Sequence, residues 1–73
     1  MNIEFEKEVG KKIRCFREKN KFTQEQLAAK LQVEGCDITR SALAKIEVGQ
    51  RHIYIDEFKL LAELLGVEYA DLL

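Results

Sequence analysis

Cysteine and histidine are the residues of this sequence best suited to binding a metal ion or acting in nucleophilic catalysis, and they are few. Cys15 and Cys36 lie far apart, and His52 is the only histidine. A Cys/His zinc site needs four ligands, and no loop has the acidic spacing of an EF-hand. A catalytic histidine would need a nucleophile and an orienting group, and neither is suggested near His52. We therefore expect two free thiols, no metal, no cofactor and no enzymatic activity.

Length and charge narrow the class of protein further. A chain of 73 residues allows one domain, residues 1–73, with a small core. The net charge is −1, but six of the seven charged residues in 11–22 are basic, whereas five of the six in 53–73 are acidic. Such a division gives a basic face and an acidic back. No apolar run approaches the ~20 residues of a membrane span, and residues 1–7 lack the apolar stretch expected of a signal peptide, so we expect a cytoplasmic protein that contacts no membrane.

Apolar spacing predicts the elements that must position these charges. Apolar residues recur at intervals of three and four, as in helices with one buried face. Gly10 lies inside the first helix, where glycine is unfavourable, so we expect another helix to approach it closely. The prediction is an all-α, compact bundle of five short helices without strands, at about 5–20, 24–31, 40–48, 55–65 and a last turn after Val67.

Capping residues mark where these helices begin and end. Thr23 and Gln26 have the spacing of a capping box, in which each side chain bonds the backbone of the other. Thr39 is the expected cap of the third helix, and Gly49 is the expected stop. Gly66 ends the fourth helix in the same way. A polar connection at 32–37 joins the helices expected at 24–31 and 40–48.

Four segments of the chain form a recognisable pattern: TQEQLA at 23–28, SALAKIEVGQR at 41–51, LLGV at 64–67 and DLL at 71–73. Together they resemble the Cro/XRE family of lambda-repressor-like helix-turn-helix domains. The resemblance covers about residues 9–73, and it is specific only when the segments are taken together. It implies a sequence-specific regulator that binds double-stranded DNA, with a repressor as the expected form, and the helix at about 40–48 reading the major groove.

Base contacts are expected from the outward face of the reading helix. Arg40, Ser41 and Lys45 point outward when the apolar residues of that helix point inward. Arginine offers a donor fork to guanine O6 and N7, and the small Ala42 can approach a thymine methyl group. The alternative for Arg40 and Lys45 is an ordinary solvated helix face.

Phosphate contacts are expected beside the two helices. The resemblance implies that Gln24, with the amides at the start of its helix, holds a phosphate. Thr39 and the segment Gln50, Arg51 and His52 complete the expected set. The alternative for Gln24 is an exposed glutamine, and that for His52 is a surface histidine.

Arg17 and Glu47 are expected to act structurally. In related domains the matching residues form a partly buried ion pair that joins the first helix to the reading helix. Arg17 adjoins the apolar stripe of the first helix, and Glu47 follows Ile46, so the spacing allows the pair. Its role would be to orient the reading helix.

The sequence departs from the family pattern in three places. The insertion Glu34–Ile38 stands where the family has almost no connection, which places the tilt of the two helices in question and could contact DNA or a partner. Val33 is then the expected core residue at the end of the second helix. Tyr54 and Glu68 replace the usual Ser or Thr caps, so we expect the last two helices to begin late or fray.

A homodimer on a palindromic operator is the expected working unit. One helix touches too few base pairs to select a site in a genome, whereas two copies related by a dyad combine their discrimination. Tyr69, Leu72 and Leu73, with Ile53 or Ile55, are the expected dimer surface; the alternative is that Leu72 and Leu73 close the core. A different function remains open, namely an antitoxin-like or protein-interaction module that binds a partner protein.

Overall fold

Five helices and no strand make up the described part of the chain, residues 2–73 of a computed structural model. The all-α prediction is therefore confirmed, and each expected helix is present within three residues of its expected ends. The first helix starts earlier than predicted and the second ends later. The bounds are α1 Ile3–Lys19, α2 Gln24–Val33, α3 Arg40–Glu47, α4 Ile55–Leu65 and α5 Tyr69–Leu72.

Side-chain caps begin the first three helices. Asn2 Oδ1 accepts the Phe5 amide at 2.9 Å, a cap that starts α1 earlier than the apolar spacing alone suggests. Thr23 Oγ1 accepts the Gln26 amide at 3.0 Å while Gln26 Oε1 accepts the Thr23 amide at 2.9 Å, which completes the predicted capping box. Thr39 Oγ1 accepts the Ala42 amide at 3.1 Å and caps α3 as expected.

The late start expected for the last two helices is not found. Tyr54 and Glu68 directly precede α4 and α5, although neither supplies a side-chain cap. A carboxylate three residues further on bonds back to the capping amide instead. Glu57 Oε1 accepts the Tyr54 amide at 3.1 Å, and Asp71 Oδ2 accepts the Glu68 amide at 2.9 Å. Half of a capping box is therefore enough to begin each helix here.

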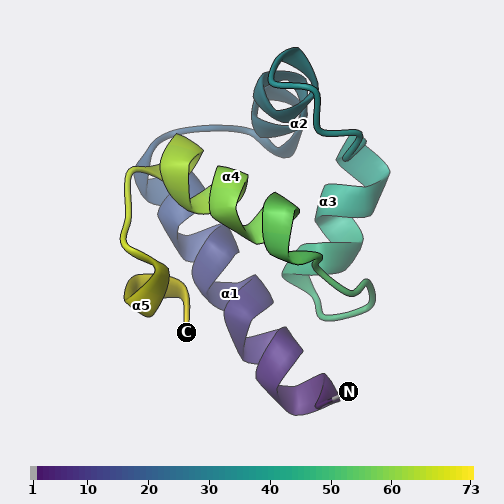
Figure 1. Ribbon diagram of the computed structural model, residues 1–73, viewed down its shortest axis with the longest axis vertical. Coiled ribbons are helices and arrows are strands. Elements are labelled where there is room, and N and C mark those ends of the chain that lie inside the picture. Colours follow the sequence, from purple (N-terminus) through teal and green to yellow (C-terminus); the bar gives the residue numbers. More distant parts are fainter. Residues whose placement is uncertain (1) are drawn as a thin grey trace.

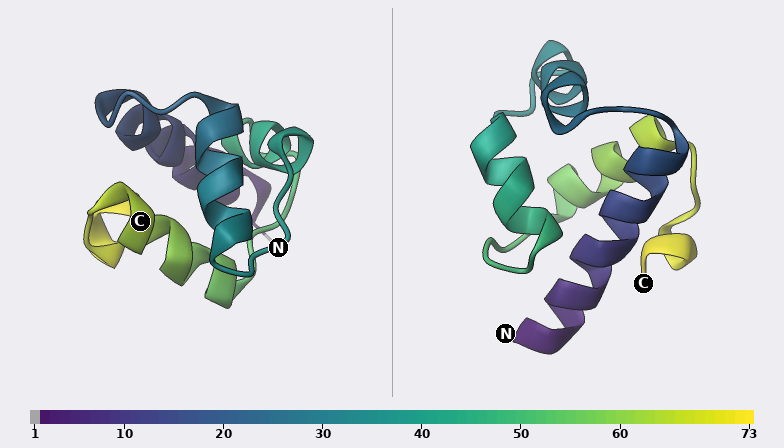
Figure 2. Two further views of the ribbon diagram at one scale, coloured as in Figure 1. Left: turned by 90° about the horizontal axis from the view of Figure 1, so that it is seen from above. Right: turned by 180° about the vertical axis from the view of Figure 1, so that it is seen from behind.

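The helices pack around α1. Helix α1 contacts α3, α4 and α5, and α2 lies against α3 and α4. In Figure 1, α4 crosses in front of α1, with α3 on one side and α5 on the other. The reverse view in Figure 2 keeps α3 and α5 on opposite sides of α1. The helix-turn-helix pair thus occupies one end and side of the molecule, and both α5 and the C-terminus lie away from it.

The core draws side chains from every helix and from one loop. Its fully enclosed members include Leu72, so the alternative that this residue closes the core is correct and its assignment to a dimer surface is wrong. Leu73 differs, since 55% of it is exposed. The largest fully buried side chains are Ile13, Leu27, Leu31, Ile38, Leu43, Ile46, Leu61 and Leu72.

Gly10 permits a close contact between α1 and α3. A Cβ atom at this position would meet the carbonyl oxygen of Ile46, and would lie 3.1 Å from the carbonyl carbon of Glu47. Any side chain here would push the two helices apart. The close approach that the sequence predicted at Gly10 is therefore present, and it brings the end of α3 against α1.

Val33 is not the core residue expected at the end of α2. Its side chain is 86% exposed, whereas Ile38 within the insertion is fully buried. Helix α2 continues to Val33, which follows the buried Leu31 by two positions, or about 200° around the helix. Val33 therefore lies on the solvent side. The chain then turns at Gly35, where φ is +83°, and Ile38 returns to the core.

Candidate nucleic-acid interface

Helix α3 presents a polar face to solvent and an apolar face to the core. Arg40, Ser41 and Lys45 are exposed, and Ala42 is half-buried. Leu43 and Ile46 are fully buried. These contacts fix the rotation of α3 about its own axis, so the three polar side chains point away from the protein. Their arrangement matches the sequence prediction, and it suits hydrogen bonding to base edges.

The diameter of an α-helix also suits a DNA groove. With its side chains a helix such as α3 is about 10–12 Å across. The major groove of B-form DNA is about 12 Å wide and admits one α-helix. Arg40 is the first residue of α3, at the end where a recognition helix meets base edges.

The predicted ion pair between Arg17 and Glu47 is present and buried. Arg17 Nε donates to Glu47 Oε2 at 2.7 Å, and Arg17 Nη2 donates to Oε1 at 3.1 Å. The two side chains are 9% and 1% exposed. The hydrogen bonds to Glu47 raise the pKa of the Arg17 guanidinium above its ordinary value. Since no buried side-chain polar atom in residues 2–73 lacks a partner, both charges are fully compensated.

This ion pair belongs to a network that reaches α2. Arg17 Nη1 donates to the carbonyl oxygen of Phe22 at 2.7 Å, just before α2 begins. Gln24 Nε2 donates to Glu47 Oε1 at 3.0 Å. Gln24 is therefore not the freely exposed glutamine of the alternative reading. Its carboxamide keeps one further N–H that can donate to a ligand.

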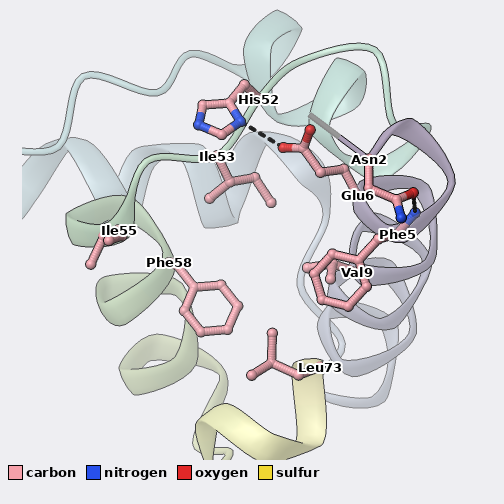
Figure 3. Close-up of a pocket in the computed structure, with 9 residues that line it drawn as sticks. All are labelled: Asn2, Phe5, Glu6, Val9, His52, Ile53, Ile55, Phe58 and Leu73. Carbon is pink, nitrogen blue, oxygen red and sulfur yellow. Dashed lines mark hydrogen bonds and ion pairs between the residues drawn. The ribbon is translucent and has the colours of Figure 1, made fainter.

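The segment after α3, which contains Arg51 and His52, is bonded to α4 and to α1. Arg51 donates to both carboxylate oxygens of Glu57 in α4, at 2.9 and 3.0 Å, and to the carbonyl oxygen of His52 at 2.9 Å. The hydrogen bonds between Arg51 and Glu57 hold the pKa of Glu57 below its ordinary value and raise the pKa of Arg51. Figure 3 shows the second attachment, in which His52 Nδ1 lies 2.7 Å from Glu6 Oε1 of α1.

Two residues that fix this segment, Glu6 and Glu57, are not among the expected site residues. Each nevertheless holds a residue of the expected phosphate-binding set. The spacing of Glu57 three residues after Tyr54 carried a signal, because it is that of a capping carboxylate. Glu6 carried none, since it is 46 positions from His52. Gln50 is exposed, and the Thr39 hydroxyl oxygen accepts a bond as the cap of α3, which leaves its O–H able to donate.

Neither cysteine is paired. Cys15 is exposed and Cys36 is half-buried, and both are free thiols, as expected. Burial raises the pKa of Cys36, so its thiol stays protonated at neutral pH. Within residues 2–73 no three His, Cys, Asp or Glu side chains gather in a way that could hold a metal ion. Over the same range, no helix is both long and apolar enough to cross a membrane.

Known proteins are similar to this chain in sequence and in fold. The chain is 35% identical over 65 residues to control protein C.BamHI from Bacillus amyloliquefaciens, a match covering 88% of this chain and 74% of that protein. The crystal structure of the DNA-binding domain of BldD is similar with a TM-score of 0.84 and 25% identity, covering 100% of this chain and 99% of that one. The helix-turn-helix domain family matches residues 10–73. The chain therefore belongs to the XRE-type helix-turn-helix domain family, whose members are DNA-binding regulators.

Proposed function

We propose that this protein is a sequence-specific transcriptional regulator that inserts α3 into the major groove of double-stranded DNA. The observation that carries the proposal is the outward face of α3, where Arg40, Ser41 and Lys45 are exposed at the start and middle of a capped helix. Relatives named as a control protein and as a DNA-binding domain support it. Occupying a promoter in this way excludes other proteins from the same groove, so we propose repression as the outcome.

Base readout is assigned to four residues of α3. Arg40 has a guanidinium free to make two parallel hydrogen bonds with guanine. Lys45 lies one helical turn beyond Ser41 and extends the readout along the groove. Ala42 is the smallest of the group and is placed against a thymine methyl group. Each two-point base contact contributes about 1–3 kcal/mol of discrimination.

Phosphate binding is assigned to the residues that flank α2 and α3. Gln24 has its second N–H, and Gln50 has an exposed carboxamide. Arg51 uses three of its five N–H groups within the protein, so two remain for a phosphate. Thr39 and His52 complete the proposed set. Because Glu57 holds the Arg51 side chain in one orientation, little side-chain entropy is lost when DNA binds.

A homodimer on a dyad-symmetric operator is the proposed working unit. The proposed surface lies away from α3 and consists of Ile55, Tyr69 and Leu73, which are 88%, 49% and 55% exposed. An apolar groove with a volume of about 380 Å³ adjoins them, between the first turns of α1, the start of α4 and Leu73 (Figure 3). Phe5 forms one wall of this groove and is itself 47% exposed. Covering such a surface with a second copy would remove it from water.

The salt dependence of binding to duplex DNA tests the proposal. Each phosphate neutralised by a basic side chain releases counterions, so log affinity should fall with log salt by about 0.9 for each contact. We expect a slope of several units, despite the net charge of −1, because local charge meets the phosphates. Fluorescence anisotropy of labelled duplexes across a salt series measures it. Absence of duplex binding at low salt, with every selected sequence, would overturn the proposal.

A further inference from the structure

The connection between α2 and α3 is long for two helices that must keep one relative orientation. Residues 34–39 separate Val33, the last residue of α2, from Arg40, the first of α3. Within this connection only Ile38 is buried, and Gln32 Nε2 donates to its carbonyl oxygen at 3.3 Å. A longer connection restricts the helices that it joins less than a tight turn does. Other contacts must therefore contribute to the angle between α2 and α3.

The opposite ends of the two helices are joined directly. Gln24 is the first residue of α2 and Glu47 is the last residue of α3, and their side chains are 3.0 Å apart. The Glu47 carboxylate is fixed independently by two hydrogen bonds from Arg17 of α1. Gln24 thus attaches α2 to a carboxylate whose position is already set. Apolar packing between α2 and α3 is non-directional, whereas this hydrogen bond has a defined geometry.

A small tilt of α3 is enough to spoil base contacts. The first and last Cα atoms of an eight-residue helix are about 10 Å apart. A tilt of about 10° therefore displaces one end relative to the other by nearly 2 Å. Hydrogen bonds to base edges need donor–acceptor distances of about 2.7–3.2 Å. Loss of the bond between Gln24 and Glu47 would let α2 and α3 change their relative tilt, which moves Lys45 out of register with the phosphate contact at α2 while the fold stays intact.

We infer that Gln24 is a positioning residue for sequence recognition: its bond to Glu47 sets the orientation of α3 relative to α2. The inference rests on the proposed function and adds to the phosphate contact proposed for the same side chain. One carboxamide N–H of Gln24 holds α3, and the other meets the backbone of the DNA. Through Gln24 the phosphate contact at α2 and the base contacts at α3 are made in one fixed geometry.

Two substitutions separate positioning from simple phosphate binding. Gln24→Met keeps the length of the side chain and removes both donors, whereas Gln24→Lys keeps a donor for Glu47. Removing one bond leaves the Arg17–Glu47 pair intact, so both variants should fold, as circular dichroism can check. Gln50→Met is the matched control, because Gln50 is an exposed glutamine without a role in orienting α3.

The first readout is amide hydrogen exchange in the free protein. In Gln24→Met we expect the amides of α3 to exchange about tenfold faster than in the wild type, while those of α4 change little. Gln24→Lys should restore most of this protection. Gln50→Met should leave the ratio of α3 to α4 exchange unchanged. This measurement uses no DNA, so it tests the positioning role even if the protein binds no duplex.

The second readout is discrimination between a selected operator and copies with one base pair changed under α3. Gln24→Met should reduce this affinity ratio about tenfold, and Gln24→Lys should recover it. Gln50→Met should weaken every duplex by the same factor. Unchanged α3 exchange in Gln24→Met, or an equal loss of affinity on all duplexes, would overturn the inference and leave Gln24 as a phosphate contact alone.

Discussion

Arg17 of α1 and Glu47 of α3 meet in a two-point ion pair, with Nε–Oε2 and Nη2–Oε1 distances of 2.7 and 3.1 Å. The pair joins two residues that are 30 positions apart in sequence. It lies next to Gly10, whose missing side chain lets the backbone at Ile46 and Glu47 approach α1. The end of the recognition helix is thus fixed by a charge pair and by close backbone packing.

Glu47→Ala should lower thermal stability markedly. The change leaves the Arg17 guanidinium buried without its partner, which costs about 3–5 kcal/mol. In a domain of this size, that loss corresponds to a fall in Tm of more than about 10 °C. Thermal unfolding followed by circular dichroism measures it. An unchanged Tm would mean that the pair is absent in solution.

A double variant shows why Glu47→Ala is destabilising: either the attraction within the pair is lost, or the Arg17 charge is left buried without a partner. Replacing both partners with apolar residues, Arg17→Met and Glu47→Leu, removes both buried charges together. Such replacements are often neutral or stabilising, so the double variant should be more stable than Glu47→Ala. A double variant that is less stable than Glu47→Ala would contradict this explanation.

Gly10→Ala should destabilise the protein. At an exposed helical position this change stabilises by about 1 kcal/mol, because alanine has the higher helix propensity. Here the added methyl group meets backbone atoms of α3, and such overpacking costs about 1–3 kcal/mol. The sign of the change in unfolding free energy, measured in urea, is therefore diagnostic. A more stable Gly10→Ala variant would show that α1 and α3 are not in close contact.

The pair between Arg51 and Glu57 should make stability depend on acid. Two hydrogen bonds from Arg51 hold the pKa of Glu57 below its ordinary value of 4.5. A carboxyl group with a depressed pKa stabilises the fold above its unfolded pKa, and this contribution is lost as the pH falls through the folded pKa. Glu57→Gln should therefore be less stable than the wild type at pH 7, and the difference should shrink below about pH 5.

Urea unfolding at pH 7, 5 and 3 measures this effect. Glu63→Gln is the matched control, because Glu63 is an exposed carboxylate of the same helix and makes no side-chain hydrogen bond or ion pair within the described chain. Its acid dependence should follow that of the wild type. A constant difference between Glu57→Gln and the wild type at all three pH values would argue against the ion pair.

Helix positions could be predicted from the sequence because caps and apolar spacing are local signals. Thr23, Gln26 and Thr39 act at the distances that their spacing indicates. The path of the insertion is not a local signal of this kind. It depends on a left-handed turn at Gly35 and on the burial of Ile38, and neither follows from periodicity. The prediction that Val33 lies in the core is therefore wrong, since it lies on the solvent side of α2.

The candidate site shows the same difference between local positions, which the sequence predicts, and contacts between distant residues, which it does not. The outward placement of Arg40, Ser41 and Lys45 follows from the apolar positions of α3, and the structure agrees with it. The partners of Gln24, Arg51 and His52 are contacts between distant parts of the chain. Such contacts depend on how the helices pack, so no spacing rule predicts them. The roles of these residues toward DNA remain predictions.

Ile55→Glu should weaken dimerisation and cooperative binding to a palindrome without unfolding the monomer. Ile55 is 88% exposed, so a carboxylate there costs little in the monomer but is unfavourable against an apolar partner surface. Deleting residues 69–73 is a poorer test, because Leu72 belongs to the core. Val33→Glu is the matched control at an apolar residue of similar exposure, 86%, on α2. Sedimentation equilibrium should show dimer loss only in Ile55→Glu, and equal effects would refute the proposed surface.

Selection of bound duplexes from a random pool, performed with the wild type and with Arg40→Ala, tests the central claim most directly. The wild type should enrich a dyad-symmetric motif whose half-sites lie about one helical turn apart. Arg40→Ala should lose preference at one base pair in each half-site, by about 1–3 kcal/mol, while the rest of the motif persists. Gln50→Ala should select the same motif with lower affinity. No enriched motif with the wild type, or an identical motif with Arg40→Ala, would contradict base reading by α3.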